Sequence, residues 1–210
     1  FFFKQKTAYE IPKRDWSSDV CSSDLAATAA LALNLDIKNV AEQLSQNTSM
    51  SKWRMELHKF GSVTLINDSY NSNPESCKAA IQTLRQLSQE SGGRSWAFLG
   101  KMHELGAESN SLHKEVGEFA VSAEIDNLIA IGETAFLTGV SAERTFVSSL
   151  SNWKEAITFF DDIEPGDVIL IKGSRAEALD LLAKSAMEFL KARELGTELN
   201  ATDDEEGEKK

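Results

Sequence analysis

The sequence predicts an α/β domain in which helices cover a doubly wound, mostly parallel sheet. Two observations lead to this fold class. Short runs of β-branched and aliphatic residues alternate with segments whose apolar residues recur at helical spacing, and a glycine or polar residue follows most of those runs. Such alternation is typical of βαβ units, whose right-handed crossovers make a doubly wound sheet the simplest topology. With 210 residues and 41% hydrophobic content, the chain can bury a core.

The first 25 residues do not fit this pattern. Phe1–Leu25 has neither helical nor strand periodicity and lacks the apolar region of a signal peptide. Its FKQKTAYEI and DWSSDVCSSDL stretches resemble the translated halves of a sequencing adapter, so we expect an artefactual, disordered leader and a natural chain cut at Ala26. A natural disordered leader is the alternative. Helices are then predicted over Ala26–Leu35 and from Ile37 to about Ser45, before a polar connection at 47–52.

Strands and helices alternate in the rest of the chain. The predicted strands are Ser62–Asn67, Trp96–Leu99, Asn127–Ile131, Arg144–Val147 and Asp167–Ile171. The predicted helices are one that opens at Asn73-Pro74-Glu75 and ends before Gly92, then Glu108–Ala123, Thr134–Thr138, Asn152–Phe160 and Arg175 to about Glu194. Asn73 can cap the first of them, with Pro74 in its first turn. Residues 51–194 therefore form one domain, and the acidic residues 195–210 predict a disordered tail.

Charge and cysteine content narrow the class of protein. Lys and Arg total 22 against 33 Asp and Glu, a formal net charge of −11, which argues against binding to nucleic acid or to an anionic membrane. No apolar run is long enough to span a bilayer. Cys21 and Cys77 are the only cysteines, so no disulfide framework is predicted and a cytoplasmic location fits best.

Polar loops after the predicted strands mark a candidate ligand site. They are residues 67–74 (NDSYNSNP), 100–106 (GKMHELG), 132–133 and 172–175 (KGSR). Ligands of open parallel sheets bind beyond the carboxyl ends of the strands, so we expect these loops at one edge. Asp68 suits a ribose diol or a cation, and the alternative is a turn cap. Lys172 to Arg175 suits a carboxylate or phosphate, and the alternative is a plain N-cap by Ser174.

Other residues indicate no chemistry by themselves. The sequence contains no phosphate-binding G-x-x-x-x-G-K-[ST], no G-x-G-x-x-G, no G-x-S-x-G and no Cys/His set with metal-ligand spacing. Cys77 lies on the apolar face of its helix and is expected in the core. His113 is expected to be a surface or packing residue and not a ligand. The residues alone therefore predict a polar ligand edge without a complete catalytic set.

Three stretches carry a resemblance to a known family. They are WRMELHKFGSVTLINDSYNSNP at 53–74, LGKMHELGAESNSLHKEVG at 99–117 and IKGSRA at 171–176. They resemble the Mur ligase family, specifically its D-alanyl-D-alanine-adding branch, in which a W/G-R-x-E segment and a short hairpin precede a [ND]-D-[SA]-Y-N-A-N-P loop. The resemblance covers about Ala26–Leu190. It implies a Rossmann-like C-terminal domain at 51–194, with 26–50 as a remnant of the family's central ATP-binding domain.

The resemblance also implies a reaction. Enzymes of this branch use ATP and Mg²⁺ to join UDP-N-acetylmuramoyl-tripeptide to D-Ala-D-Ala through an acyl phosphate, in peptidoglycan precursor synthesis. They are expected to be cytoplasmic monomers. The family's phosphate loop and Mg²⁺ ligands would lie upstream of Ala26, so the fragment alone is expected to be inactive, and no catalytic or metal-binding residue is assigned within it.

Site residues are carried over by motif. By resemblance, Arg54 reaches the nucleotide phosphates, Asp68 binds the ribose hydroxyls and Tyr70 orders the nucleotide or the dipeptide. A permanent, bidentate guanidinium suits a phosphate. The remaining candidates are expected to shape the substrate loop or to bind the dipeptide carboxylate; they are Asn71, Asn73, Lys172, Ser174 and Arg175. Lys101 stands where the family has an acidic residue, which puts any metal or dipeptide role at that position in question.

Alternative functions remain open from sequence. One is another Mur-type or folylpolyglutamate-type ligase, against which the NDSYNSNP loop argues. Another is a non-enzymatic flavodoxin-like binding module such as a receiver domain, which would need an acidic cluster around Asp68. A purely structural regulatory domain is a third. A ligase domain should bring Arg54, Asp68 and Tyr70 onto one surface.

Overall fold

A computed structural model describes the chain at residues 30, 33, 35, 36, 38, 39, 52–140 and 143–207, with side chains described as far as residue 196. The chain divides into two units, Phe1–Met50 and Ser51–Lys210. The leader predicted over Phe1–Leu25 lies outside the described residues, as do most of the two helices predicted over 26–45. In the first unit, the amide of Leu35 donates to the carbonyl of Ala30 (3.0 Å).

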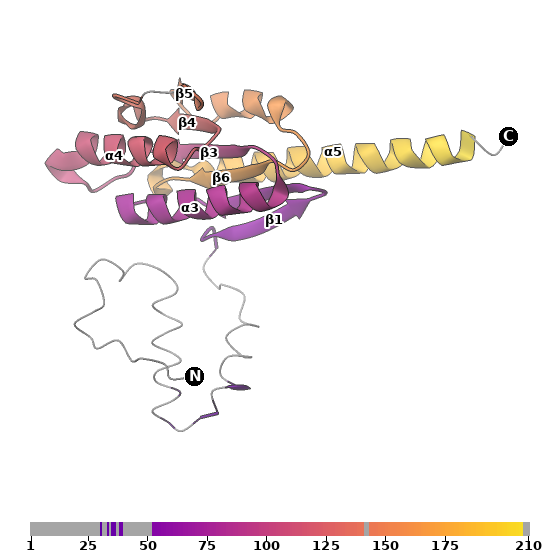
Figure 1. The fold of residues 1–210 in the computed structure, drawn as a ribbon, viewed down its shortest axis with the longest axis horizontal. Helices are drawn as coiled ribbons and strands as arrows, with labels where there is room; N and C mark the ends of the chain where they lie inside the picture. The colour runs from indigo at the N-terminus through magenta and orange to yellow at the C-terminus, as the bar shows by residue number, and fades with distance from the viewer. Residues whose placement is uncertain are drawn as a thin grey trace. The chain divides into compact units, whose positions relative to one another are not determined.

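A six-stranded sheet forms the centre of the second unit (Figure 1). Its strands are β1 (Glu56–Phe60), β2 (Val63–Asp68), β3 (Ser95–Gly100), β4 (Asn127–Ile131), β5 (Phe146–Leu150) and β6 (Val168–Lys172), in the spatial order β1-β2-β6-β3-β4-β5. Every pair is parallel except β1–β2, which is an antiparallel hairpin. The predicted mostly parallel α/β sheet is confirmed, and the hairpin strand β1 adds an edge that periodicity did not predict.

Helices cover both faces of this sheet. They are α3 (Pro74–Ser91), α4 (Ser109–Ser122) and α5 (Leu179–Gly207), with 3₁₀ segments η1 (Gly106–Glu108), η2 (Thr134–Leu137), η3 (Glu155–Asp162) and η4 (Arg175–Glu177). The start of α3 is confirmed as predicted: Asn73 Oδ1 accepts from the amide of Ser76 (2.8 Å), and the Ser76 hydroxyl accepts from the amide of Asn73 (3.2 Å). Gly92 ends the helix in the left-handed region, with φ 74°. Among the described residues, none of the helices has the length and apolar content to cross a bilayer.

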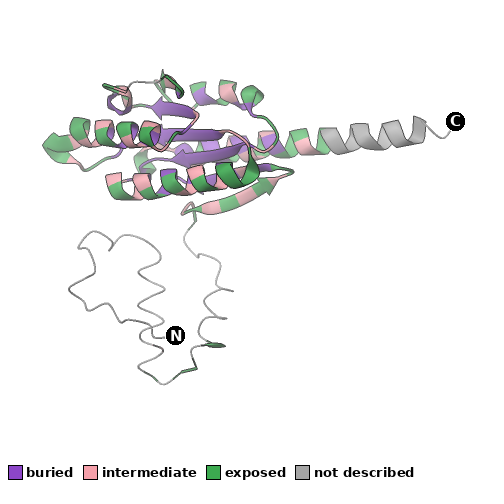
Figure 2. Ribbon diagram, in the orientation of Figure 1, coloured by how far each residue is buried: buried purple, intermediate pink, exposed green. Residues whose placement is uncertain are grey.

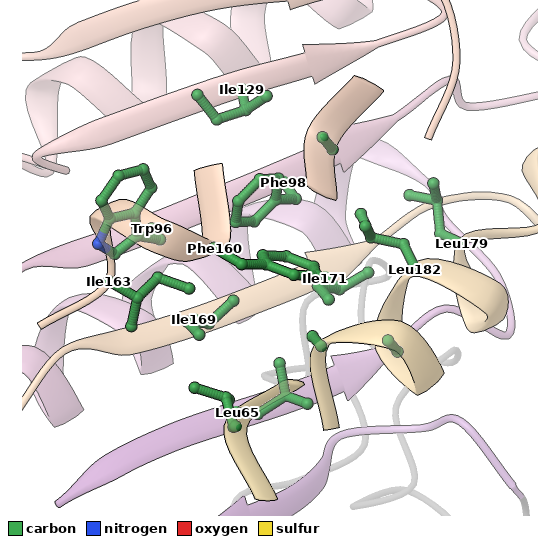
Figure 3. Packing of buried hydrophobic residues seen from close by; sticks show 14 of the residues in the cluster. Leu65, Trp96, Phe98, Ile129, Phe160, Ile163, Ile169, Ile171, Leu179 and Leu182 are labelled. Atoms are coloured by element: carbon green, nitrogen blue, oxygen red, sulfur yellow. The ribbon is translucent and has the colours of Figure 1, made fainter. Parts of the chain in front are cut away.

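Two hydrophobic layers hold the helices to the sheet (Figure 2). Successive strand residues point to opposite faces: Phe98 packs with η3 and α5, whereas Leu99 packs with α3 and α4. Figure 3 shows Phe98 and Ile171 of the sheet beside Phe160 of η3, and the rings of Phe98 and Phe160 meet edge to face at 6.3 Å. Both faces are buried, which explains why the central strands are almost continuously apolar.

Three element boundaries differ from those predicted. The strand expected at Arg144–Val147 lies later, at Phe146–Leu150, because its pairing with β4 sets the register. The helix expected at Asn152–Phe160 is a 3₁₀ segment over Glu155–Asp162. Helix α5 continues to Gly207, whereas the sequence predicted its end near Glu194 and a disordered tail. Residues 195–207 include two glycines and several Thr, Asn and Asp residues, which are poor helix formers, so intrinsic propensity does not account for this extension.

The order of the strands in the sheet indicates where a ligand could bind. The chain leaves β2 and β3 toward α3 and α4 on one face, but leaves β6, which lies between them, toward α5 on the other face. Crevices at such switch points, beyond the carboxyl ends of the strands, are where open parallel sheets bind ligands. The loops at 67–74, 100–106 and 172–175 follow these three strands.

Candidate functional site

A buried ion pair lies at the carboxyl ends of β2 and β6. Asp68 and Lys172 are direct partners in the strand register, and Lys172 Nζ donates to Asp68 Oδ2 at 2.5 Å and to the carbonyl of Asn71 at 2.9 Å. The Lys172 side chain is 1% exposed and the Asp68 side chain 10% exposed. The pair therefore joins two strand ends and the following loop. Lys172 was predicted to bind a dipeptide carboxylate. Its ammonium group is instead buried and paired with Asp68, which does not suit that role.

A turn at 53–55 covers the carboxylate of Asp68. Asp68 Oδ1 accepts from the amide of Met55 (3.1 Å), and Glu56 Oε1 accepts from the amide of Trp53 (2.8 Å). Trp53 and Met55 both have left-handed backbones, with φ 65° and 47°. That conformation costs a residue other than glycine about 1–2 kcal/mol, so the two carboxylates stabilise a strained turn. Arg54 lies between the two strained residues.

Two guanidinium groups stack on aromatic rings beside this turn. The Arg54 guanidinium lies 4.4 Å from the centre of the Tyr70 ring, and the Arg175 guanidinium lies 4.0 Å from the centre of the Trp53 ring. The amide of Tyr70 donates to the carbonyl of Trp53 (3.0 Å), which ties the two pairs together. Arg54 and Tyr70 are thus in contact beside Asp68, but the three residues do not share the one open surface that was expected of a ligase domain. Tyr70 is exposed, whereas Asp68 is buried beneath the turn.

The two asparagines of the loop make local hydrogen bonds. Asn71 Oδ1 accepts from the amide of Ser72 (2.8 Å), and the Asn71 carbonyl accepts from Lys172. Asn73 uses its side-chain oxygen to cap α3. Both residues shape the loop, as the motif implied, and Asn73 does so through the capping bond that its position in the sequence predicted. Polar residues at these positions are therefore required by the backbone as well as by any ligand.

Polar groups also join the loops that follow β3 and β6. Ser174 Oγ accepts from the amide of His103 (3.0 Å), and the amide of Ser174 donates to the carbonyl of Lys101 (3.3 Å). His103 Nε2 lies 2.5 Å from Glu177 Oε1, and Lys101 Nζ lies 3.6 Å from a carboxylate oxygen of Glu133. Ser174 is buried and holds the neighbouring loop, so its hydroxyl caps no helix. The carbonyl of Lys101 and the hydroxyl of Ser174 join the two loops.

Two residues important to this geometry were not recognised from the sequence. His113 is fully buried on α4; its Nε2 lies 2.8 Å from the amide of Met102 and its Nδ1 lies 2.7 Å from the carbonyl of Ser109. Because an amide only donates, Nε2 accepts and Nδ1 carries the proton of a neutral ring. His113 thus holds the loop after β3. Glu56 is the second residue, and its place in the WRME segment next to Arg54 was the available signal.

Cys77 is a core residue, as predicted. Its thiol is buried on α3, and its Sγ lies 3.0 Å from Ser72 Oγ. Burial raises the pKa of the Cys77 thiol, and the nearby Lys172 ammonium and the Ser72 hydrogen bond lower that pKa by less. The thiol therefore stays protonated at neutral pH, unlike a nucleophilic cysteine.

The site offers oxygen and guanidinium groups for a nucleotide, but no cation cage. Within the described part of the chain, no group of three or more His, Cys, Asp or Glu residues could hold a metal ion. Asp68 is already neutralised by Lys172. A carboxylate has about four acceptor positions, and the two bonds at Asp68 leave capacity for a hydroxyl donor. Among the described residues, the site therefore keeps acceptor capacity at Asp68 but offers no ligand set that suits Mg²⁺.

Comparison with known proteins adds a family and relatives. Residues 53–175 match the family described as Mur ligase, glutamate ligase domain. The chain is 32% identical over 180 residues to the UDP-N-acetylmuramoyl-tripeptide--D-alanyl-D-alanine ligase of Mycobacterium tuberculosis (strain ATCC 25618 / H37Rv), covering 75% of this chain and 35% of that relative. It is 31% identical over 176 residues to the enzyme of the same name from Bacillus subtilis (strain 168), covering 81% and 38%.

Solved structures agree with this relationship. A crystal structure of MurF from Acinetobacter baumannii superposes with a TM-score of 0.69 at 27% identity, covering 80% of this chain and 37% of that chain. A second crystal structure of the same protein gives a TM-score of 0.64. The chain thus spans little more than a third of the length of the relatives that it matches.

Proposed function

This chain belongs to the Mur ligase family, and from that premise we propose that it is the C-terminal domain of a ligase that adds D-Ala-D-Ala to UDP-N-acetylmuramoyl-tripeptide. The names of its relatives support this branch, as does the NDSYNSNP loop at 67–74. The contact of Arg54 with Tyr70 beside Asp68, at the carboxyl end of β2, is the observation that carries the proposal. We assign to this end of the sheet the closing of the nucleotide site.

Each of these residues has a role that its surroundings support. Arg54 supplies a permanent positive charge to the phosphates, and the Tyr70 ring orients its guanidinium. Asp68 accepts from a ribose hydroxyl with its remaining acceptor capacity. Lys172 acts indirectly, because it neutralises Asp68 and fixes the loop at Asn71. The contribution of these groups is positioning and charge neutralisation, which dominate catalysis of phosphoryl transfer.

For the dipeptide, we favour Arg175 among the candidates. Its side chain is 53% exposed, stacks on Trp53 and pairs with Asp180 (3.4 Å), whereas Lys172, Ser174 and Asn73 are engaged within the protein. Because a partly exposed ion pair contributes little free energy, Arg175 can exchange Asp180 for the dipeptide carboxylate without a rearrangement of the loops. The planar guanidinium group of an arginine can donate two parallel hydrogen bonds to a carboxylate.

The reaction itself needs parts that this domain does not hold. The carboxylate of the tripeptide takes the γ-phosphoryl group of ATP, the dipeptide amine attacks the resulting acyl carbon, and inorganic phosphate leaves as the amide forms. We assign the phosphate loop and the Mg²⁺ ligands to the two thirds of the relatives' length that have no counterpart in the chain. Mg²⁺ would neutralise phosphate charge there.

Titration of the 210-residue chain with ADP tests this proposal. We expect ADP to shift the amide resonances of Arg54, Asp68 and Tyr70, and Arg54→Ala to weaken ADP binding about 10-fold or more, because a charge-assisted hydrogen bond contributes about 1.5–3 kcal/mol. Arg85→Ala is the matched control, since Arg85 pairs with Glu124 on the protein surface. Absence of shifts at the carboxyl end of β2, or equal weakening by both variants, would refute the nucleotide site.

A further inference from the structure

The carboxylate of Glu56 connects three segments that meet at the candidate site. Its Oε1 accepts from the amide of Trp53 (2.8 Å), and its Oε2 accepts from Asn67 Nδ2 (3.0 Å). Glu56 and Asn67 are direct partners across the β1–β2 hairpin, and Asn67 Oδ1 in turn accepts from Ser69 Oγ (2.7 Å). Asn67 and Ser69 are both 1% exposed, so the chain of hydrogen bonds runs through the interior.

Glu56 acts on the segment that displays Arg54. The turn holds Trp53 and Met55 at positive φ. The amide of Trp53 donates to Glu56 and the amide of Met55 donates to Asp68, and these two hydrogen bonds offset the strain. Loss of the Glu56 acceptor releases the amide of Trp53, and Trp53 relaxes toward a negative φ. That rotation changes the direction of Arg54 and moves the Trp53 carbonyl, which accepts from Tyr70. The stacking of Arg54 on Tyr70 then depends on Glu56.

We propose that Glu56 is a positioning residue for nucleotide binding: it fixes the 53–55 turn so that Arg54 is held over Tyr70 and directed at the phosphates. The proposal rests on the nucleotide site proposed above. Glu56 touches no ligand in this arrangement, because its Oε1 is engaged by Trp53 and its Oε2 by Asn67, with His58 Nε2 3.7 Å from the same Oε2. Its effect on affinity is therefore exerted through Arg54.

Two conservative variants of Glu56 separate the effect of the position of its oxygens from the effect of its negative charge. Glu56→Asp keeps the negative charge but withdraws the oxygens by one methylene group. Glu56→Gln loses the charge but keeps an oxygen in reach of the Trp53 amide, and the Asn67 amide can turn to accept from the new NH₂ group. We expect Glu56→Asp to weaken ADP binding about 3- to 10-fold, the range for one hydrogen bond, and Glu56→Gln to remain within about twofold of wild type. The opposite order would overturn the proposal.

A double-mutant cycle tests whether Glu56 affects ADP binding through Arg54. If Glu56 acts through Arg54, Arg54→Ala combined with Glu56→Asp binds ADP no more weakly than Arg54→Ala alone. Fully additive losses would overturn the proposal. Glu115→Ala is the control, because Glu115 lies on α4 and pairs with Lys78.

A measurement without ligand keeps this proposal distinct from the nucleotide site. The ring current of Tyr70 shifts the side-chain proton resonances of Arg54, which lie over the ring. We expect Glu56→Asp to move these resonances toward their random-coil positions, and Glu56→Gln to leave them in place, while the amide spectrum of the sheet is preserved in both. If the wild-type chain binds no ADP, the proposed function fails but this readout still decides the positioning role. Unchanged Arg54 resonances in Glu56→Asp would refute it.

Discussion

Lys172 and Asp68 face each other in register at the ends of β6 and β2, with Nζ 2.5 Å from Oδ2 and both side chains withdrawn from solvent. The 53–55 turn covers this pair, because the amide of Met55 donates to Asp68 Oδ1 (3.1 Å). Its carboxylate also accepts from the backbone of that turn, so the charge pair and the display of Arg54 are parts of one arrangement.

Removal of the ammonium leaves a buried carboxylate without its counter-charge. We expect Lys172→Met to lower the free energy of unfolding by about 3–5 kcal/mol, measured by urea denaturation. Lys184→Met is the control, since Lys184 and Glu188 form an exposed pair whose loss costs less than about 1 kcal/mol. Lys172→Met combined with Asp68→Asn should recover part of the loss. Equal stability of the two single variants would contradict a buried, paired charge.

Asp167 accepts several hydrogen bonds at the opposite end of β6. It accepts from the amide, Nε and Nη2 of Arg94, from Trp96 Nε1 (2.8 Å) and from the amide of Glu164 (3.0 Å). Its hydrogen bond raises the pKa of the Arg94 guanidinium above the usual value, so the pair stays charged at alkaline pH. We expect Asp167→Asn to lower the free energy of unfolding by about 2–3 kcal/mol, because the new NH₂ group faces donors.

Asp162→Asn is the matched control for that substitution. Arg94 contacts Asp162 through its backbone carbonyl (2.6 Å), which the substitution leaves unchanged. Its free energy of unfolding should stay within about 0.5 kcal/mol of wild type. A loss in Asp162→Asn as large as that in Asp167→Asn would show that general charge, and not the buried acceptor, stabilises this end of the sheet.

The buried thiol predicts a pH dependence of stability. The pKa of Cys77 is raised in the folded state, so above the unfolded value of about 8.5 the unfolded chain loses a proton that the folded chain keeps. Stability is therefore unaffected below about pH 8 and falls as the pH rises above it, by at most about 1.4 kcal/mol per pH unit. Urea denaturation between pH 7 and 10 should show this slope reduced in Cys77→Ala. Parallel curves for the two proteins would contradict the raised pKa.

Gly117 allows α4 to approach η2 closely. A Cβ at this position would lie 1.6 Å from the carbonyl oxygen of Phe136, a backbone atom that cannot move aside without shifting η2. We expect Gly117→Ala to lower the free energy of unfolding by about 3 kcal/mol. Gly196 on α5 has no atom within 4 Å of such a Cβ, so Gly196→Ala should leave stability unchanged or raise it by up to about 1 kcal/mol. Equal effects would contradict the close helix contact.

Much of the fold was predictable because its signals are local. The alternation of β2, β3, β4 and β6 with α3 and α4 follows from apolar periodicity, and the capping of α3 depends on residues only three positions apart. Periodicity did not predict the edge strand β1, because its half-exposed residues alternate only weakly in hydropathy, and only the family resemblance implied a hairpin there. The order β2-β6-β3 required the assembled sheet, since β6 enters between two strands that precede it in the chain.

The sequence by itself determined the fold class, the polar loops at the strand ends and the motif residues Arg54, Asp68 and Tyr70. Only the tertiary structure decided that Lys172 is buried and neutralises Asp68, and that Glu56 accepts from the backbone of the turn that carries Arg54. The physical reason is distance along the chain. Asp68 and Lys172 are 104 positions apart and meet because the parallel register of β2 and β6 places them opposite each other. That register is set by burial of both faces of the sheet together, which no local window of sequence contains.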